Sequence, residues 1–102
     1  MFHKRVTGTG NIAVTVDPGK AFALLEVRLH LGAAGGANSF TVSVDSAEGS
    51  AYDTLLKTQD MSSATDVAFI PTRPHVFTNG DKIACAWTNA SSILWGLEVI
   101  WE

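Results

Sequence analysis

The segment KIACAWTNASSILWGLEVIWE, Lys82 to Glu102, carries the most regular hydrophobic pattern in the chain. In its first half, Ile83, Cys85 and Trp87 alternate with small or polar residues. After a polar break at residues 89–92, a second alternating set follows, formed by Ile93, Trp95, Leu97, Val99 and Trp101. A period of two is typical of a strand with one buried face. We therefore predict two strands joined by a short turn, a hairpin whose tryptophans anchor the core.

The same period recurs upstream in short segments that are separated by turn-forming residues. Such segments lie at residues 12–16, 25–31, 40–44 and 66–70, with less regular ones at 51–58 and 75–77. Ala, Leu and Glu in residues 21–31 also favour a helix, but the unbroken alternation from Leu25 to Leu31 favours a strand. Pro71 and Pro74 end the strand before them, because proline cannot donate to a β-ladder. The pattern predicts an all-β fold, a β-sandwich or jelly roll of about eight antiparallel strands.

Residues 1–102 are predicted to form a single domain, because a chain of this length has room for one core. Residues 1–10 form a predicted N-terminal arm, which either pairs at a sheet edge or reaches a neighbouring molecule. The expected core combines the buried faces of both sheets. Its members are Leu25, Val27, Leu29, Phe40, Val42, Val44, Val67, Phe69, Ile83, Cys85, Trp87, Trp95, Leu97 and Val99.

The charge and hydrophobicity of the chain indicate which classes of partner to expect. Charged residues make up only 17% of the chain, against roughly 25% in ordinary soluble domains. So few charges indicate that part of the surface is covered in an assembly. The net charge of -3 argues against a nucleic-acid partner, which usually meets a basic face. No apolar run approaches the ~20 residues that span a bilayer, and none follows the N-terminal basic residues as in a signal peptide. We expect a soluble protein with no membrane partner.

No residue set indicates an enzyme. Cys85 is the only cysteine, and its parity with Trp87 places it on the buried face, where a thiol is unreactive. His3, His30 and His75 lack the spacing of a metal site. Asp45 and Glu48 suit either a calcium site or, more ordinarily, the capping of a turn. Two carboxylates that meet only in space cannot be recognised from sequence, yet so short a chain has little room for a deep cleft. We expect no catalytic activity, no metal and no cofactor.

Four features together resemble a known family. They are the short polar arm, the Pro18-Gly19 turn before a long strand, the segment Asn79-Gly80-Asp81-Lys82-Ile83 leading to Trp87-Thr88-Asn89, and an aromatic-rich final strand. Over about residues 6–101 the chain resembles the capsid decoration or cement proteins, small phage virion proteins with jelly-roll folds. The resemblance implies a homotrimer on the capsid surface, made in the host cytoplasm, that binds the major capsid protein and strengthens the shell. It brings no catalytic residues.

Under this hypothesis, the contact residues lie near the two ends of the chain. We expect Phe2, His3 and Arg5 to help dock the protein to the shell. Trp101 is the expected subunit contact, although it could instead cap the end of the sandwich. The small-residue loops at 33–37 and 61–64 either pack against another subunit or simply connect strands. The alternative function is a carbohydrate- or receptor-binding module of a phage tail, in which Tyr52, Trp95 or Trp101 stacks on a sugar.

Overall fold

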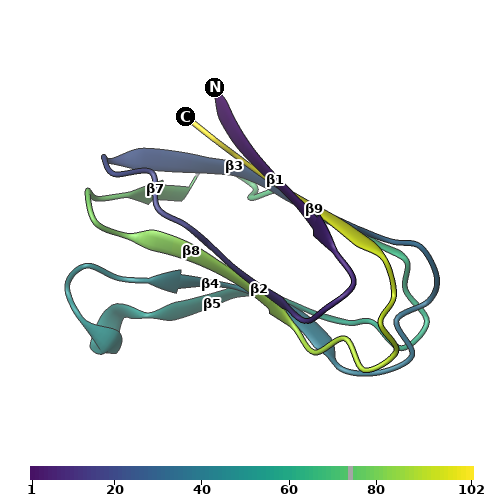
Figure 1. Cartoon of the computed structure of the whole chain (residues 1–102). Helices are drawn as coiled ribbons and strands as arrows, with labels where there is room; N and C mark the ends of the chain where they lie inside the picture. The colour runs from purple at the N-terminus through teal and green to yellow at the C-terminus, as the bar shows by residue number, and fades with distance from the viewer. Residues whose placement is uncertain (74) are drawn as a thin grey trace.

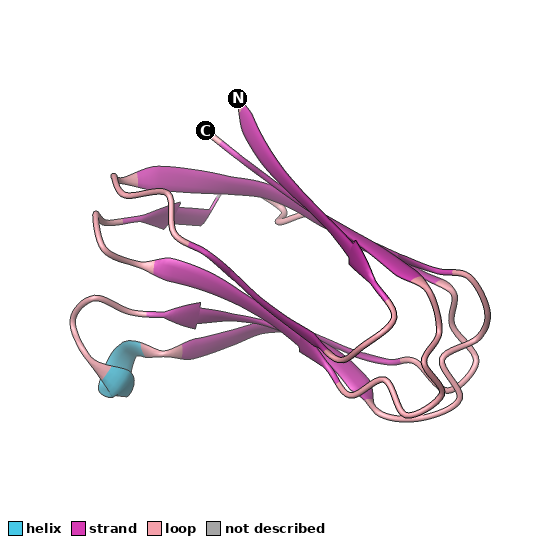
Figure 2. Ribbon diagram, viewed as in Figure 1, coloured by secondary structure: helices cyan, strands magenta, loops and turns pink. Residues whose placement is uncertain are grey.

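The computed structural model describes residues 1–73 and 75–102, and it consists of two antiparallel β-sheets packed face to face (Figures 1 and 2). The strands are β1 (Phe2–Gly8), β2 (Ile12–Val16), β3 (Phe22–Leu31), β4 (Ser39–Asp45), β5 (Thr54–Asp60), β6 (Asp66–Phe69), β7 (His75–Phe77), β8 (Lys82–Trp87) and β9 (Trp95–Trp101). One 3₁₀ turn, η1 (Ser50–Tyr52), precedes β5. The predicted all-β sandwich is confirmed. Within the described part, no helix has the length and apolar character needed to cross a membrane.

The strand order of each sheet explains the fate of the N-terminal arm. The first sheet has the order β1-β9-β3-β6, with β7 also paired to β3, and the second has the order β2-β8-β4-β5. Residues 2–8 of the arm are β1, which pairs with β9 from Phe2 opposite Trp101 to Gly8 opposite Trp95. Of the two roles left open for the arm, the structure shows the pairing at a sheet edge. Figure 1 shows both termini at the same end of this sheet.

The predicted C-terminal hairpin is wrong. β8 pairs with β2 and β4, whereas β9 pairs with β1 and β3, so the polar segment between them crosses from one sheet to the other. The Asn79-Gly80 turn likewise connects β7 in the first sheet to β8 in the second. A period of two reveals which side of a strand is buried but not which strand lies beside it. Trp87 and Trp95 therefore both reach the same core, from opposite sheets.

The predicted core is confirmed except at two positions. In β3 the register against β9 shifts between Leu24 and Glu26, so Leu24 is fully buried and Leu25 is only half-buried. The bulge adds one residue and moves the following side chains to the opposite parity. Phe69 is partly buried against the core. The strand that contains it, β6, ends at Phe69, before Pro71, and Pro74 lies outside the described residues.

Loop contacts close the end of the sandwich opposite the termini. The buried Asn89 amide donates to the carbonyls of Thr9, Gly10 and Ile93 at 2.8–3.2 Å, and its oxygen accepts from the Ile93 N–H at 3.0 Å. These bonds tie the β1–β2 turn to the β8–β9 connection. The loops at residues 33–37 and 61–64 contact each other, with the Gly35 N–H 3.2 Å from the Ala64 carbonyl oxygen. Met61 in the second loop is fully buried.

Candidate functional site on the first sheet

The β1–β9 pair carries the four predicted contact residues, with Phe2 and Trp101 on one face and His3 and Arg5 on the other. Phe2 lies opposite Trp101, and their rings stack with centroids 6.1 Å apart. The Lys20 ammonium lies 4.0 Å from the centroid of the Phe2 ring on which it rests. Phe2 therefore covers part of Trp101 within one molecule, and it leaves 47% of its own area exposed. His3 and Arg5 lie further along β1 and point to the outer face of the sheet.

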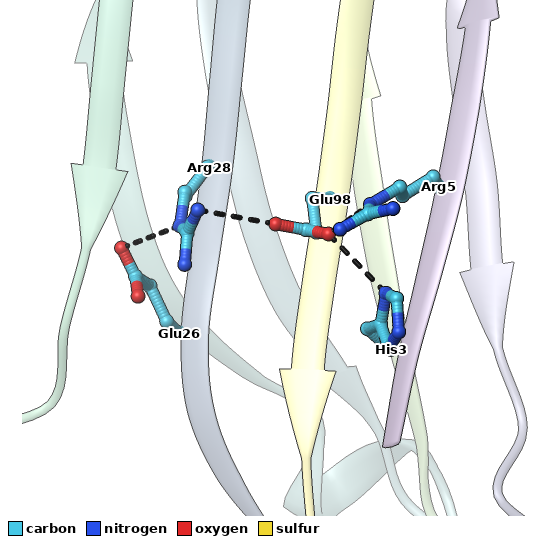
Figure 3. A network of polar contacts seen from close by, with 5 residues as sticks. All are labelled: His3, Arg5, Glu26, Arg28 and Glu98. Atoms are coloured by element: carbon cyan, nitrogen blue, oxygen red, sulfur yellow. Dashed lines mark hydrogen bonds and ion pairs between the residues drawn. The ribbon is translucent and has the colours of Figure 1, made fainter. Parts of the chain in front are cut away.

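On that outer face, Glu98 is the centre of an ion-pair network that we call the Glu98 network: His3, Arg5, Glu26, Arg28 and Glu98 (Figure 3). The Glu98 carboxylate accepts a hydrogen bond from Arg5 Nε, and its Oε2 lies 3.3 Å from His3 Nδ1. Its Oε1 lies 3.2 Å from Arg28 Nη1. Arg28 Nε is 2.9 Å from the Glu26 carboxylate. One carboxylate on β9 thus joins cations on both neighbouring strands.

The surroundings of Glu98 hold its carboxyl group in the charged form. The hydrogen bond from Arg5 is the largest effect on the Glu98 pKa and lowers it. Burial opposes it as the next largest effect, and the charges of Arg5 and Arg28 add to the lowering, so the pKa lies below its ordinary value. The Glu98 side chain is 14% exposed, whereas those of Arg5 and Arg28 are 72% and 54% exposed. The guanidinium groups consequently present most of their area to solvent or to a partner.

Beside the Glu98 network, a shallow hollow of about 700 Å³ crosses the four strands β1, β9, β3 and β6. We call it the outer-face hollow. The strand register defines this hollow as three rows of residues, each of which runs across the neighbouring strands. The middle row points into the core, and its backbone forms the floor. The rows on either side point outward and form the two walls. The floor row is Val6, Leu97, Leu29 and Val67. One wall holds Arg5, Glu98, Arg28 and Ala68, and the other holds Thr7, Gly96, His30 and Asp66.

Small residues open the hollow and a second ion pair borders it. Gly96 lies in the middle of one wall, and a Cβ built there would meet no atom within 4 Å. At the β3–β6 end, His30 Nδ1 lies 2.6 Å from Asp66 Oδ1. This hydrogen bond, followed by that of Thr65, lowers the Asp66 pKa. A smaller recess of about 260 Å³ continues the hollow past Gly96 toward the exposed Leu94.

Sequence reasoning recognises part of this face but not its centre. The outward parity of Glu26, Arg28 and His30 on β3 follows from the alternation alone. The role of Glu98 does not follow from the alternation. In the sequence it is a single carboxylate between apolar residues, and it meets the arginines only because β1 and β3 flank β9. That pairing order is a property of the topology, and the alternation carries no signal for it.

The remaining sequence candidates lie away from this face or inside the core. Cys85 is 1% exposed, and burial raises the pKa of its thiol to about 12. Tyr52 is 66% exposed in η1, at the β4–β5 end of the second sheet, and Trp95 is buried. Among residues 1–73 and 75–102, no three His, Cys, Asp or Glu side chains gather closely enough to hold a metal ion. Asp45 ends β4, and Glu48 lies in the turn that follows, where its N–H donates to the Ser46 hydroxyl.

Comparison with known proteins adds no relative. The chain matches no protein-family model, and no curated protein is significantly similar to it in sequence. The fold and the site define a two-sheet β-sandwich with a charged and hollowed outer face on one sheet.

Proposed function

We propose that this chain is a structural virion protein of the capsid decoration class, which associates with itself and docks on the major capsid protein at the capsid surface. The observation that supports this proposal is the outer edge of β1. All seven residues of β1 pair with β9, and among the described residues no backbone hydrogen bond joins residues 2–8 to any other segment. An open edge of this length offers main-chain donors and acceptors to a strand of another protein.

The charges of the β1 side chains indicate which kind of strand could pair with this edge. His3, Lys4 and Arg5 form an uninterrupted basic run, so two β1 strands placed side by side would bring like charges together. Lys4 also reaches across the sandwich, with Nζ 3.3 Å from the Thr15 carbonyl oxygen. An acidic extended segment of the shell protein would meet complementary charge at residues 3–5 of the edge. We therefore assign the β1 edge to the shell rather than to a sister subunit.

The contact between sister subunits belongs, in this proposal, to the end of the sheet where the termini meet. Met1 is 81% exposed and Phe2 is 47% exposed, and Phe2 stacks on Trp101 beneath it. Covering these apolar groups in a homotrimer would bury area that a monomer leaves in water. Light scattering coupled to size-exclusion chromatography measures this directly. A trimer that Phe2→Ser reduces to monomers supports the contact, and a monomeric parent protein at micromolar concentration contradicts it.

Rebinding to particles tests the docking surface. Particles of the phage that encodes the chain, stripped of the protein, are mixed with purified parent protein or with the Lys4→Glu/Arg5→Glu variant, and pelleted. We expect the parent protein to sediment with the particles and the variant to stay in the supernatant, with binding that weakens as salt rises. Lys57→Glu, a charge reversal on β5 in the other sheet, is the matched control. Equal sedimentation of all three proteins would refute docking through β1.

A second candidate function is favoured by a different observation. The outer-face hollow is a feature that a purely structural subunit does not need, and it suits a carbohydrate- or receptor-binding module of a phage tail. The aromatic residues named for sugar stacking do not line it: Tyr52 and Trp101 lie elsewhere, and Trp95 borders only the smaller recess with its side chain buried.

A further inference from the structure

We propose that the outer-face hollow binds a short oligosaccharide, which lies across the strands and forms hydrogen bonds with the side chains of the two walls. The inference names a ligand class for the second candidate function and rests on it, and it is argued from the shape and chemistry of the hollow. Its test is separate from that of docking through the β1 edge. Arg5 belongs to both surfaces, so a particle-bound subunit presents the hollow from β9 to β6, and a free subunit presents all of it.

The shape of the hollow suits an extended ligand. Adjacent strands lie about 4.8 Å apart, so a ligand that crosses from β1 to β6 spans three intervals, or about 14 Å. The hollow is shallow, and its volume of about 700 Å³ is spread along this direction. A short chain of sugar rings fits such a trough better than a compact molecule, because compact ligands bind in sites that enclose most of their surface.

The walls supply both halves of the hydrogen bonds that sugar hydroxyl groups form. A hydroxyl group donates one hydrogen bond and accepts others. Arg5 and Arg28 provide donors, while the carboxylates of Glu98 and Asp66 provide acceptors, and the two signs balance within the hollow. A neutral ligand rich in hydroxyl groups therefore finds partners along its whole length without having to neutralise a net charge. Hydrogen bonds to charged groups are also the stronger kind.

The groups on the walls are already held in position. Glu98 fixes Arg5 and Arg28, and Asp66 fixes His30 through the 2.6 Å contact. Binding then costs little side-chain entropy, because the ion pairs have ordered the long side chains before the ligand arrives.

Two other classes of ligand fit the hollow less well. The floor is backbone whose N–H and C=O groups point along the plane of the sheet toward neighbouring strands, so an extended peptide finds no main-chain partners there. A polyphosphate chain would meet Glu98 and Asp66 as well as Arg5 and Arg28, so the balanced charges of the hollow give it no net attraction. The β1 edge can form main-chain hydrogen bonds with a peptide strand, whereas the side chains of the outer-face hollow can form hydrogen bonds with hydroxyl groups.

Among the described residues, no exposed aromatic ring lines the hollow, so binding lacks the stacking contribution that aromatic platforms supply. We expect a dissociation constant of about 1 mM for one site. Several copies on one particle would raise the avidity, because the second and later contacts become intramolecular.

Amide chemical shifts of the ¹⁵N-labelled full chain test the proposal, with maltotriose, cellotriose and chitotriose as separate probes at about 10 mM, tenfold above the expected dissociation constant. We expect at least one trisaccharide to shift the amides of Thr7, His30 and Gly96 while those of β4 and β5 stay in place. Gly96→Val fills the hollow, and we expect it to weaken this binding at least about tenfold. Gly10→Val is its control, since a Cβ at Gly10 would likewise meet no atom within 4 Å but lies outside the hollow.

Asp66→Ala keeps the test decisive if Gly96→Val fails to fold, because the Asp66 side chain is 68% exposed and its loss leaves the core intact. We expect it to weaken binding about threefold to tenfold through the lost acceptor. Absence of shifts in the hollow with all three sugars would overturn the proposal. Undiminished binding by either hollow variant would also overturn it, as would an equal response of these amides to an acidic peptide. Particle rebinding measured in parallel separates these outcomes from failure of the docking proposal.

Discussion

Glu98 and Arg28 lie directly opposite each other on β9 and β3, with Arg28 Nη1 3.2 Å from Glu98 Oε1. The carboxylate sits on the strand between two cationic neighbours, since Arg5 lies opposite it on β1. The pair thereby links the edge strand and the inner strands through side chains as well as through the ladder. Replacing Glu98 would leave two arginines on adjacent sides of an uncharged position.

Glu98→Gln should therefore destabilise the protein in a pH-dependent way. The folded-state pKa of Glu98 lies below its ordinary value of 4.5, so its contribution to stability is fully present above that value and is lost as the pH falls through the folded-state pKa. Urea unfolding at neutral pH should show a lower midpoint for the variant, and the difference should close in acid. Glu48→Gln, in an exposed turn, should change the midpoint little at either pH. A gap between parent and Glu98→Gln that is constant with pH would contradict the role of the charge.

Trp87→Ala and Trp95→Ala should each lower the free energy of unfolding by about 3 to 5 kcal/mol, a large part of the stability of a small domain. Both side chains are nearly buried, and each indole N–H also donates to a loop carbonyl: Trp87 to Ala37 at 3.1 Å and Trp95 to Gly10 at 2.8 Å. Thermal and urea unfolding measure the loss. Tyr52→Ala removes an aromatic ring that is 66% exposed and should have little effect. A tryptophan variant that melts like the parent would refute its place in the core.

The hydrophobic alternation predicts the burial of most of the core but not the connectivity of the sheets. It assigns Trp87 and Trp95 correctly to the interior because the inner faces of both sheets share one core. The alternation predicts the wrong neighbours for the two strands. A polar segment such as residues 89–92 is compatible both with a hairpin turn and with a crossing to the other sheet. The prediction that Leu25 is buried is wrong for a more local reason. A bulge between Leu24 and Glu26 buries Leu24 instead, and the alternation does not indicate this bulge.

Less of the candidate site than of the fold could be predicted from the sequence. Phe2, His3, Arg5 and Trp101 are individual candidates in the sequence. The register of β1 against β9 sets Phe2 against Trp101 on one face and brings His3 and Arg5 to Glu98 on the other. The outer-face hollow depends on how residues of four different strands line up, with Gly96 in one wall and Ala68 in the other. Such a coincidence arises from register across strands far apart in the sequence, which local patterns do not encode.

Cys85 should resist modification in the folded protein. Burial raises the pKa of its thiol to about 12, so at pH 8 almost none of it is the reactive thiolate. Incubation with iodoacetamide followed by mass measurement should show no added mass under native conditions and one adduct in concentrated urea. An adduct formed rapidly without denaturant would show that β8 opens locally or that the thiol is accessible.

Asn89→Ala should destabilise the protein by about 2 to 3 kcal/mol, because it leaves several buried backbone groups without a partner. The Asn89 amide serves the carbonyls of Thr9, Gly10 and Ile93, so its loss affects two turns at once. Asn79→Ala, at an exposed turn position, is the matched control. Urea unfolding of the three proteins measures the difference, and equal midpoints for the two variants would mean that the Asn89 bonds contribute nothing beyond an ordinary turn residue.

Gly35→Ala should destabilise the fold by about 1 to 3 kcal/mol through overpacking, although alanine is ordinarily a mild replacement for glycine. A Cβ at position 35 would lie 2.5 Å from the Met61 carbonyl oxygen and 3.0 Å from a Trp87 ring carbon, so one of the two loops must move. Gly96→Ala is the control: its Cβ meets nothing within 4 Å, and its effect should lie between neutral and about 1 kcal/mol stabilising. If calorimetry gives both variants the same melting temperature, the close contact between the loops at residues 33–37 and 61–64 is not maintained in solution, and these loops would then be free to meet a neighbouring subunit.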